Sequence, residues 1–417
     1  MAVLILSLLL SVGYGLLLDD QLPQYSKYGR SLVLIGGAQA DDNAAVHDTI
    51  VELSGGVNHA KIGLIVAASA NPPDSCNFYT DIFLNRYNAL SVYCVPIDLN
   101  HISGNSDPQV IENIKQQTGF FFGGGDQQRV IDTFFLNNHV PSPALLAIRE
   151  RHAAGAVIAG TSAGTACQPT AVMINGGMSW EALRYGAHET ESPDLPANGL
   201  AYNKDGGIGF FDGFILDSHF SERGREGRLI RLLSETRHFV HGVDWGIGID
   251  EDTALVVTHA GTDQEMGKVI GTHGVFFVDV SKSHIDTSTL YFNIDNVMAH
   301  FLTTGDSIFL KNKTIMFSAS KRSMTGHEMY VNAITTQDIF GGKRHVSEKP
   351  EFTSVATSIF DSVLDTGSFG DTKEKHPRFR VTMSRAVAGA EGYVERKQNF
   401  HTDITSYKNL YLKINEI

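Results

Sequence analysis

The chain has 417 residues, of which 42% are hydrophobic and 19% are charged. This balance is typical of a globular protein with one large domain or two of ordinary size. The formal net charge of −13 argues against a nucleic-acid partner or an anionic membrane surface, because binding to either requires a broad basic face. The acidic residues are spread along the chain, so we interpret this charge as favouring solubility.

The first fifteen residues have the pattern of a signal peptide. Residues 2–12 are almost wholly apolar, and the small residues Gly13 and Gly15 and the polar pair Asp19-Asp20 follow. The apolar run is too short to span a bilayer. We therefore predict cleavage near Gly15 and secretion, to the extracellular space or to a lysosomal or other endomembrane lumen. The alternative is a buried first helix or strand.

Three cysteines and one sequon bear on this prediction. Cys76 and Cys94 flank a predicted helix and are able to pair, but the sequence leaves their bonding open. Cys167 is predicted to be a small buried residue. The triplet Asn312-Lys-Thr314 is a glycosylation sequon, which is usable only in a secreted chain.

Short apolar runs alternate with helical patterns over the first 160 residues. Strands that read as continuous apolar runs, with helices between them, predict a doubly wound, mostly parallel α/β sheet covered on both faces. The functional end of such a sheet is the carboxyl end of its strands. We expect strands at 31–37, 61–66, 91–96, 119–122 and 156–160, and helices at 41–53, 78–87, 107–117, 126–135 and 143–153.

The pattern changes after Gly207 and again after Leu310. Strands are predicted at 208–216, 246–257 and 268–280, and a helix at 225–237. We place the first domain at 28–310. The extension at 311–417 is more polar, with short strand-like pieces such as 313–317 and 379–383. It is either a small second domain or an elaboration packed on the first.

Two glycine clusters, Gly36-Gly37 and Gly123-Gly124-Gly125, follow predicted strands. Neither fits a dinucleotide or Walker pattern, so a phosphate site is only weakly indicated. No metal site is predicted either, since His188-Glu189 lacks the second histidine of a zinc motif and the acids at 250–252 lack EF-hand spacing. We expect no cofactor.

The apolar run at 156–160 stops at Gly160-Thr-Ser-Ala-Gly164. The spacing Gly-x-Ser-x-Gly is typical of a nucleophile elbow, a sharp strand-to-helix turn that exposes a serine hydroxyl. The backbone N–H of Ala163 is then a candidate oxyanion donor. The alternative is a glycine-rich turn with an ordinary capping serine.

A serine nucleophile needs a base and a group that orients the base. His219 follows a predicted strand, at the sheet edge where a base is expected. Three nearby arginines suit capture of a substrate carboxylate, although they are equally compatible with a solvated helix face. The acids at 250–252 offer the orienting carboxylate.

Four motifs follow one another along the chain: Gly123-Gly-Gly-Asp-Gln127, Gly160-Thr-Ser-Ala-Gly164, Asp217-Ser-His-Phe-Ser-Glu-Arg-Gly-Arg-Glu-Gly-Arg-Leu229 and Gly248-Ile-Asp-Glu-Asp-Thr-Ala254. Their order resembles that seen in cyanophycinases, which are serine exopeptidases of the peptidase S51 family. The resemblance covers roughly 32–310, and the segment 301–306 resembles the family's closing segment.

The resemblance implies a fold like that of class I glutamine amidotransferases, with Ser162 as nucleophile, His219 as general base and Glu251 as orienting acid. A true amidotransferase needs a cysteine where Ser162 stands, so we set that function aside. The resemblance also implies an oxyanion hole from Gly124, Gly125 and Ala163. The implied substrate-binding residues are Gln127, Asp217, Ser218, Arg223, Arg225 and Arg228.

In cyanophycinases the substrate is multi-L-arginyl-poly-L-aspartate and the product is the β-Asp-Arg dipeptide. By this resemblance Asp217 meets a substrate guanidinium and the arginines hold carboxylates. Two departures bear on the substrate: Ser218 stands where bacterial cyanophycinases often have glutamine, and the extension is absent from the compact bacterial enzymes. The alternatives are a secreted peptidase for other β-aspartyl or Asp-X peptides, and a non-catalytic secreted binding protein. The resemblance also suggests a homodimer.

Overall fold

The computed structural model describes residues 29–342, 349–364, 367–397 and 403–417. The predicted signal peptide at 1–15 lies outside the described residues. Within them, none of the helices combines the length and the apolar composition that a membrane span requires.

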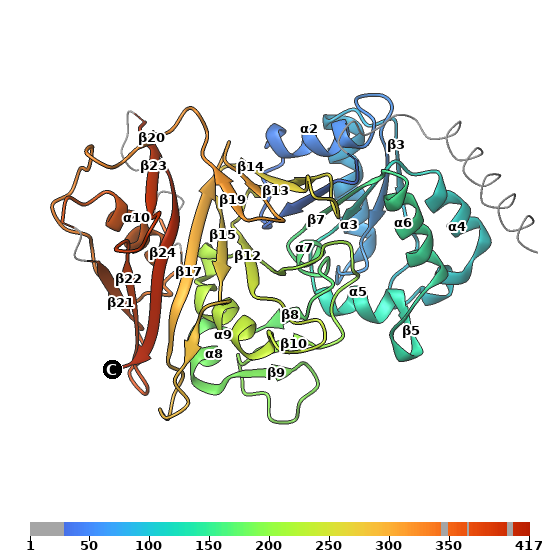
Figure 1. Ribbon diagram of the computed structural model, residues 1–417. Helices are drawn as coiled ribbons and strands as arrows, with labels where there is room; N and C mark the ends of the chain where they lie inside the picture. The colour runs from blue at the N-terminus through green and yellow to red at the C-terminus, as the bar shows by residue number, and fades with distance from the viewer. Residues whose placement is uncertain (1–28, 343–348, 365–366, 398–402) are drawn as a thin grey trace, which may run out of the picture.

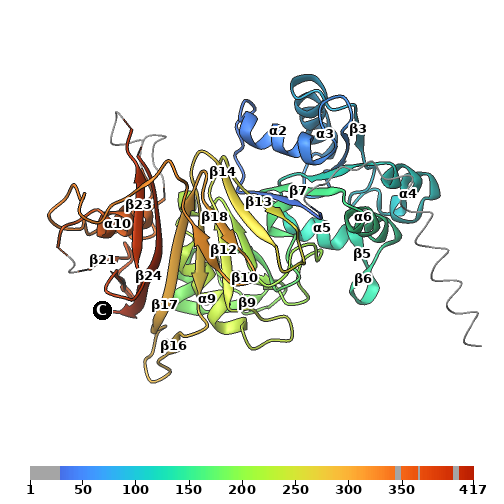
Figure 2. The ribbon, with the colours of Figure 1, turned by 45° about the horizontal axis from the view of Figure 1, so that its top comes forward.

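A nine-stranded sheet forms the first layer, in the order β19-β18-β14-β13-β1-β7-β4-β2-β3 (Figures 1 and 2). Five neighbouring strands are parallel: β1 (Leu32–Ile35), β7 (Val157–Thr161), β4 (Gly119–Phe122), β2 (Lys61–Ile65) and β3 (Ser91–Cys94). Four antiparallel strands complete it: β13 (Thr253–Thr258), β14 (Met266–Gly271), β18 (Ser307–Phe309) and β19 (Thr314–Met316). The predicted α/β sheet is confirmed, with antiparallel strands in the half beyond β1.

Helices cover both faces of the parallel strands, as the alternation of side chains along β1 shows. Val33 and Ile35 pack with Val46 of α2, whereas Leu32 and Leu34 share a cluster with α4, α5 and α6. Because successive residues of a strand point to opposite faces, a strand buried on both sides is apolar throughout. The helices are α2 (Ala44–Leu53), α3 (Pro72–Thr80) with its continuation η1 (Asp81–Arg86), α4 (Pro108–Lys115), α5 (Gln127–Phe134) and α6 (Pro143–Ala153).

A second, ten-stranded sheet begins at β11 and runs into the C-terminal extension. Its main path is β11 (Ile215–Ser218), β12 (Trp245–Ile249), β15 (Gly274–Asp279), β17 (Ile294–Thr303), β24 (Ile404–Glu416), β22 (Phe379–Ser384) and β21 (Ser368–Asp371), with β16 (His284–Ile285), β20 (Arg322–Ser323) and β23 (Glu391–Glu395) attached. Helices α8 (Ser179–Tyr185), α9 (Glu226–Thr236) and α10 (Glu351–Phe360) pack on it. Smaller sheets are formed by β8 (Met173–Gly176), β10 (Leu200–Asn203) and β9 (Ala187–Glu189), and by β5 (Phe135–Leu136) and β6 (Val140–Pro141).

The extension continues this sheet, because β24 lies antiparallel to β17, and Figures 1 and 2 show the two strands side by side. A buried ion pair of 2.7 Å between Lys321 and Asp306, both side chains 0% exposed, joins the two sides of position 310. Asp306 also accepts a hydrogen bond from Ser406 of β24. The domain limits 28–310 and 311–417 stay predictions, but the strands on either side share one sheet.

Two predictions for the second half of the chain differ from the structure. Residues 208–214 are not strands, because their backbone bonds to the irregular segment 167–169, as in Ile208 N–H to Cys167 O at 2.6 Å. The strand-like pieces predicted in the extension are confirmed at β19 and β22, but α10 and the thirteen-residue β24 were not predicted. Apolar residues alternate only in the second half of β24, and polar residues interrupt the first half.

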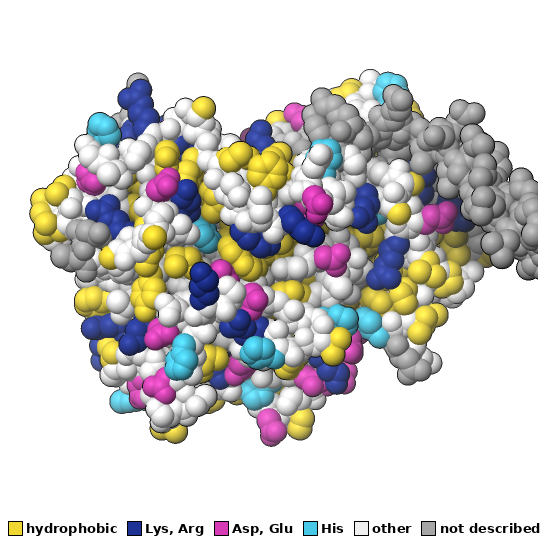
Figure 3. All heavy atoms as spheres, in the orientation of Figure 1, with side chains coloured by type: hydrophobic (Ala, Val, Ile, Leu, Met, Phe, Trp, Pro, Cys, Tyr) yellow, Lys and Arg dark blue, Asp and Glu magenta, His cyan; other side chains and the backbone are white. Residues whose placement is uncertain are grey.

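The question of cysteine pairing, which the sequence leaves open, is answered by a disulfide. Cys76 of α3 and Cys94 at the end of β3 are bonded, with their Cα atoms 6.0 Å apart. Cys167 is free and buried, as predicted. On the face shown in Figure 3, Lys and Arg side chains are scattered among Asp and Glu, without a broad basic surface.

Candidate active site

Ser162 lies at a sharp turn between β7 and the short helix α7 (Ala163–Ala166), with φ 55° and ψ −116°. The two glycines of the motif allow the turn to close. A Cβ at Gly160 would lie 2.1 Å from the Gly164 carbonyl oxygen, and one at Gly164 would lie 2.1 Å from the Phe122 carbonyl oxygen. Because a side chain cannot occupy either position without a main-chain shift, the elbow geometry predicted from the sequence is confirmed.

His219 follows β11 directly and packs against the glycine pair that ends β1. Its backbone N–H donates to the Gly36 carbonyl at 2.7 Å. A Cβ at Gly37 would lie 2.3 Å from the His219 Nε2 atom, and the φ of Gly37 is 106°. By its sequence alone, this pair indicates only a weak phosphate loop. Its position after the first strand, level with the elbow on the neighbouring β7, is the signal that connects it to the site.

The three residues predicted as a triad are brought together from three strand ends. The Ser162 hydroxyl oxygen lies 2.8 Å from Nε2 of His219, and Nδ1 of His219 lies 2.7 Å from Oε1 of Glu251. The arrangement favours the tautomer in which Nδ1–H donates to Glu251 and Nε2 accepts from the serine. The side chains are 57 and 32 residues apart in the chain.

Burial lowers the pKa of His219 below its usual value, and the positive charges of Arg223 and Arg225 lower it further. The hydrogen bond to Glu251 and the charge of that carboxylate act in the opposite direction. The net effect favours a neutral imidazole near neutral pH, which is the form that can accept a proton.

Glu251 is held by neighbours on both sides of its main chain. Its N–H donates to Oε2 of Glu222 at 3.1 Å, and its carbonyl accepts from His273 Nδ1 at 2.9 Å and from the Thr253 hydroxyl at 3.0 Å. Burial raises the pKa of Glu222 to about 8, and the nearby Asp250 carboxylate adds to this rise. Glu222, which sequence reasoning did not single out, therefore belongs to the site.

The segment predicted to form the oxyanion hole lies beside the serine. A Cβ at Gly124 would be 3.4 Å from Cβ and 3.9 Å from Oγ of Ser162. Burial raises the pKa of the neighbouring Tyr79 hydroxyl, and the backbone of Gly124 acts in the opposite direction. The oxyanion roles of Gly124, Gly125 and Ala163 stay predictions.

The predicted substrate-binding residues fall into a buried set and a more exposed set. Asp217 and Arg228 form a two-pronged ion pair, with Nη2–Oδ1 at 2.6 Å and Nε–Oδ2 at 2.8 Å. Their side chains are only 1% and 3% exposed. The expectation that Asp217 meets a substrate guanidinium is therefore corrected: a protein arginine already occupies it, and Arg228 is likewise unavailable to a carboxylate.

Arg225 and Ser218 lie next to this pair. Arg225 Nη1 donates to the Ser218 carbonyl at 2.5 Å and lies 3.3 Å from Oδ1 of Asp217. Burial lowers the pKa of Arg225 to about 9. The Ser218 side chain is buried and Arg223 is exposed. Gln127 is half-buried and donates from Nε2 to the Ile174 carbonyl at 2.9 Å.

Among the residues that the structure describes, His, Cys, Asp and Glu nowhere gather in a group of three or more that suits a metal ion. The arrangement instead has the parts that serine hydrolases use: a serine at a strand-to-helix turn, a histidine that accepts its proton, and a carboxylate behind the histidine.

Comparisons with known proteins agree with this class. The model of "Peptidase family S51" matches residues 32–264. The chain belongs to peptidase family S51 and is a serine peptidase with an α/β fold like that of class I glutamine amidotransferases.

Similar curated proteins are cyanophycinases. That of Geminocystis herdmanii is 31% identical over 256 residues, which is 61% of this chain and 82% of the relative. Those of Trichormus variabilis and Synechococcus elongatus are 28% and 27% identical, over 72% and 70% of this chain and 91% and 83% of theirs. The structure of a peptidase from an acI-B1 Actinobacterium aligns with a TM-score of 0.45 at 22% identity, over 68% of this chain and 97% of that one.

Proposed function

We propose that this peptidase hydrolyses cyanophycin, multi-L-arginyl-poly-L-aspartate, to β-Asp-Arg dipeptides, with Ser162, His219 and Glu251 as its catalytic triad. The observation that carries the proposal is the continuous hydrogen-bonded chain Ser162–His219–Glu251, with contacts of 2.8 and 2.7 Å. The similarity to cyanophycinases over about 70% of the chain supports the substrate.

In the proposed mechanism, the Ser162 oxygen attacks the scissile carbonyl while His219 Nε2 takes the hydroxyl proton. The tetrahedral oxyanion is stabilised by backbone N–H groups of Gly124, Gly125 and Ala163. The C–N bond then breaks, His219 gives the proton to the leaving amine, and an acyl-enzyme on Ser162 remains. Water activated by His219 attacks this ester and releases the product.

Arg223 and Arg225 are the residues that we assign to substrate carboxylates. Arg223 is exposed, and both charges lie close enough to affect His219. Asp217 and Arg228 do not contact the substrate in this proposal. Asp217, which is paired with Arg228, accepts a hydrogen bond from Arg225 and so positions its guanidinium. A substrate guanidinium must therefore be bound by groups other than Asp217. Gln127, next to the glycine segment beside Ser162, is a further pocket candidate.

Two alternatives remain as outcomes of the test. The enzyme acts on other β-aspartyl or Asp-X peptides, or the chain is a binding protein that uses this fold without catalysis. The intact triad geometry favours an enzyme, because binding alone gives no reason for a hydroxyl 2.8 Å from a neutral imidazole. Secretion and a homodimer are kept as predictions.

The test is incubation of the purified protein with insoluble cyanophycin, followed by mass spectrometry of the soluble products. Ser162→Ala serves as the matched control, since it removes one oxygen and leaves the turn unchanged. β-Asp-Arg from the wild type alone supports the proposal. If no dipeptide forms but isoaspartyl or Asp-X peptides are cleaved, the first alternative replaces it. Equal turnover by Ser162→Ala would refute the nucleophile.

A further inference from the structure

The C-terminal extension touches the loop that follows the proposed general base. Residues 338–342, which we call the bracing segment, precede α10 and are tied to the extension by the Ile339 N–H, which donates to the Asp371 carbonyl at 2.9 Å. A Cβ at Gly224 would lie 2.0 Å from the Phe340 carbonyl oxygen, and one at Gly342 would lie 2.0 Å from the Glu222 carbonyl oxygen. The two main chains are therefore in direct contact at two points.

The Phe340 ring makes a third contact, with the start of α9 and α8. A Cβ at Gly227 would lie 2.8 Å from Phe340 Cζ and 2.9 Å from Ser179 Cβ. The Ser179 hydroxyl donates to the Gly224 carbonyl at 2.5 Å and accepts from the Arg228 N–H at 3.2 Å. Phe340 thus lies against the same small residues that connect the loop to α9.

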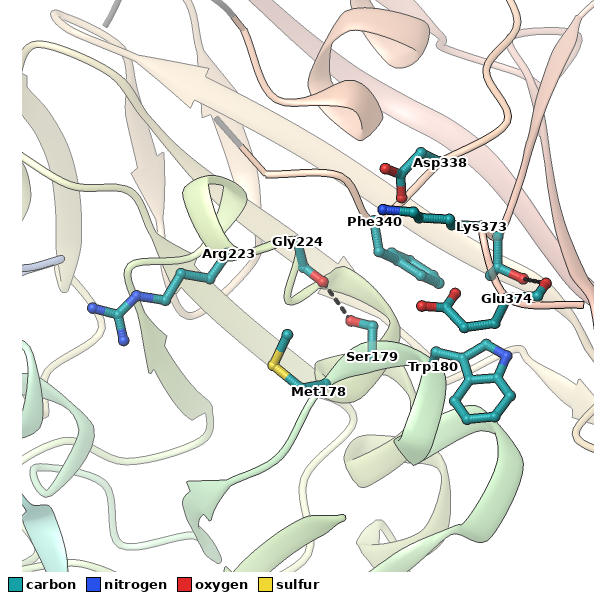
Figure 4. A pocket seen from close by; sticks show the side chains of 10 residues that line it. Met178, Ser179, Trp180, Arg223, Gly224, Asp338, Phe340, Lys373 and Glu374 are labelled. Atoms are coloured by element: carbon teal, nitrogen blue, oxygen red, sulfur yellow. Dashed lines mark hydrogen bonds between the residues drawn. The ribbon is translucent and has the colours of Figure 1, made fainter. Parts of the chain in front are cut away.

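Figure 4 shows the seam between the two parts, around a small open hollow that residues of both parts line. Phe340, Lys373 and Glu374 of the extension lie on one side, and Ser179 and Gly224 on the other. The Arg223 side chain points away from this hollow, although its residue is part of the lining. The loop is accordingly braced from one side while its arginine faces elsewhere.

Glu222 connects the bracing segment to the triad. Its main-chain oxygen contacts Gly342, while its buried carboxyl group, 6% exposed, accepts the N–H of Glu251 at 3.1 Å. Glu251 in turn orients His219 at 2.7 Å. A displacement of Glu222 therefore moves the orienting acid, and the imidazole follows.

We propose that the extension is a positioning element for catalysis: the bracing segment holds Glu222, and through it Glu251 and His219, where the Ser162 hydroxyl is activated. The family match ends at residue 264, so the brace comes from the part of the chain beyond it. The inference rests on the proposed role of Ser162 as nucleophile, but on no particular substrate.

Gly342→Ala and Phe340→Ala test the brace. In Gly342→Ala the contact of 2.0 Å must open to at least 3.0 Å, which displaces the Glu222 main chain or the segment itself. A misplacement of about 1 Å costs on the order of 100-fold in rate. We expect a fall of about 10- to 100-fold in kcat. KM changes only as far as the shift also moves Arg223, whose Cα would lie 3.5 Å from the added Cβ.

The readout that does not depend on the substrate is the labelling rate of Ser162 by a fluorophosphonate. In this reaction the serine Oγ–P bond forms, the P–F bond breaks, fluoride leaves and His219 takes the hydroxyl proton. Both variants are expected to label about 10- to 100-fold more slowly than the wild type. Phe340→Leu keeps an apolar side chain against Gly227 and is expected to restore most of the rate.

Phe360→Leu is the matched control, because Phe360 packs within the extension against Tyr407 and lies at the opposite end of α10 from Glu351, whose N–H bonds to the bracing segment. It lowers stability and leaves the labelling rate within about threefold. If it slows labelling as much as Phe340→Ala at equal loss of Tm, the extension acts only through stability and the proposal is wrong. Labelling of the wild type without cyanophycin hydrolysis contradicts the proposed substrate alone. A wild type that labels no faster than Ser162→Ala overturns both proposals.

Discussion

Replacement of Glu251 by glutamine is the perturbation that tests the triad most directly. The variant keeps the size of the side chain and removes the negative charge that faces Nδ1 of His219 at 2.7 Å. An amide is also able to donate to Nδ1, which favours the tautomer with the proton on Nε2. That tautomer cannot accept the proton of Ser162, so both effects slow the attack.

The size of the charge effect follows from the geometry. Two unit charges about 4 Å apart attract each other by about 4 kcal/mol at an effective dielectric constant of about 20. Glu251 is 29% exposed, so water screens part of this, and about 3 kcal/mol of stabilisation of the imidazolium remains. That corresponds to about 10²-fold in rate. The tautomer effect raises the total to as much as about 10⁴-fold, the loss known for an equivalent change in a serine protease.

The assay is the release of β-Asp-Arg at a substrate concentration below KM, together with the labelling rate of Ser162. Asp252→Asn is the matched control, since Asp252 lies in the same turn but accepts hydrogen bonds from Ala40 and Asn43 instead of His219. We expect less than a threefold effect from it. If Glu251→Gln labels and hydrolyses within threefold of the wild type, the orienting acid is misassigned.

Two further predictions concern the arginines. The positive charge of Arg223 lowers the pKa of His219, so Arg223→Gln is expected to raise that pKa. Because His219 must be neutral to act as the base, the acid limb of the pH profile of kcat/KM then moves to higher pH. Arg223→Lys keeps the positive charge and is expected to leave the acid limb at the wild-type pH. If the acid limb of Arg223→Gln does not move at low ionic strength, where charge effects are strongest, the effect of Arg223 on the pKa of His219 is contradicted. Arg228→Ala leaves the buried Asp217 carboxylate without its two-pronged partner, which costs about 3–5 kcal/mol in the free energy of unfolding; a denaturant midpoint equal to that of the wild type would show that the pair is not structural.

Much of the fold is predictable from local pattern. Asp107 followed by Pro108 predicts the start of α4, and the Asp107 carboxylate caps the helix by accepting the Gln109 N–H at 2.8 Å. The apolar runs of β1, β4 and β7 indicate strands buried on both faces, as found. The run at 208–214 shows the limit of this reasoning, since apolar content predicts that a segment is buried but not which segment its backbone forms hydrogen bonds with.

Local sequence patterns predict the chemistry of the site: the elbow around Ser162, the histidine after a strand and the acid in the turn at 250–252 are each such a pattern, and together they resemble one family. Which charged side chains pair with one another follows only from the tertiary structure. In the sequence, Asp217, Arg225 and Arg228 all belong to one polar stretch, whereas in the fold Asp217 and Arg228 form a buried ion pair. The tertiary structure also pairs β24 with β17, about a hundred residues earlier in the chain, and places Phe340 against the loop after His219. Pairings over such distances depend on contacts that no short pattern contains.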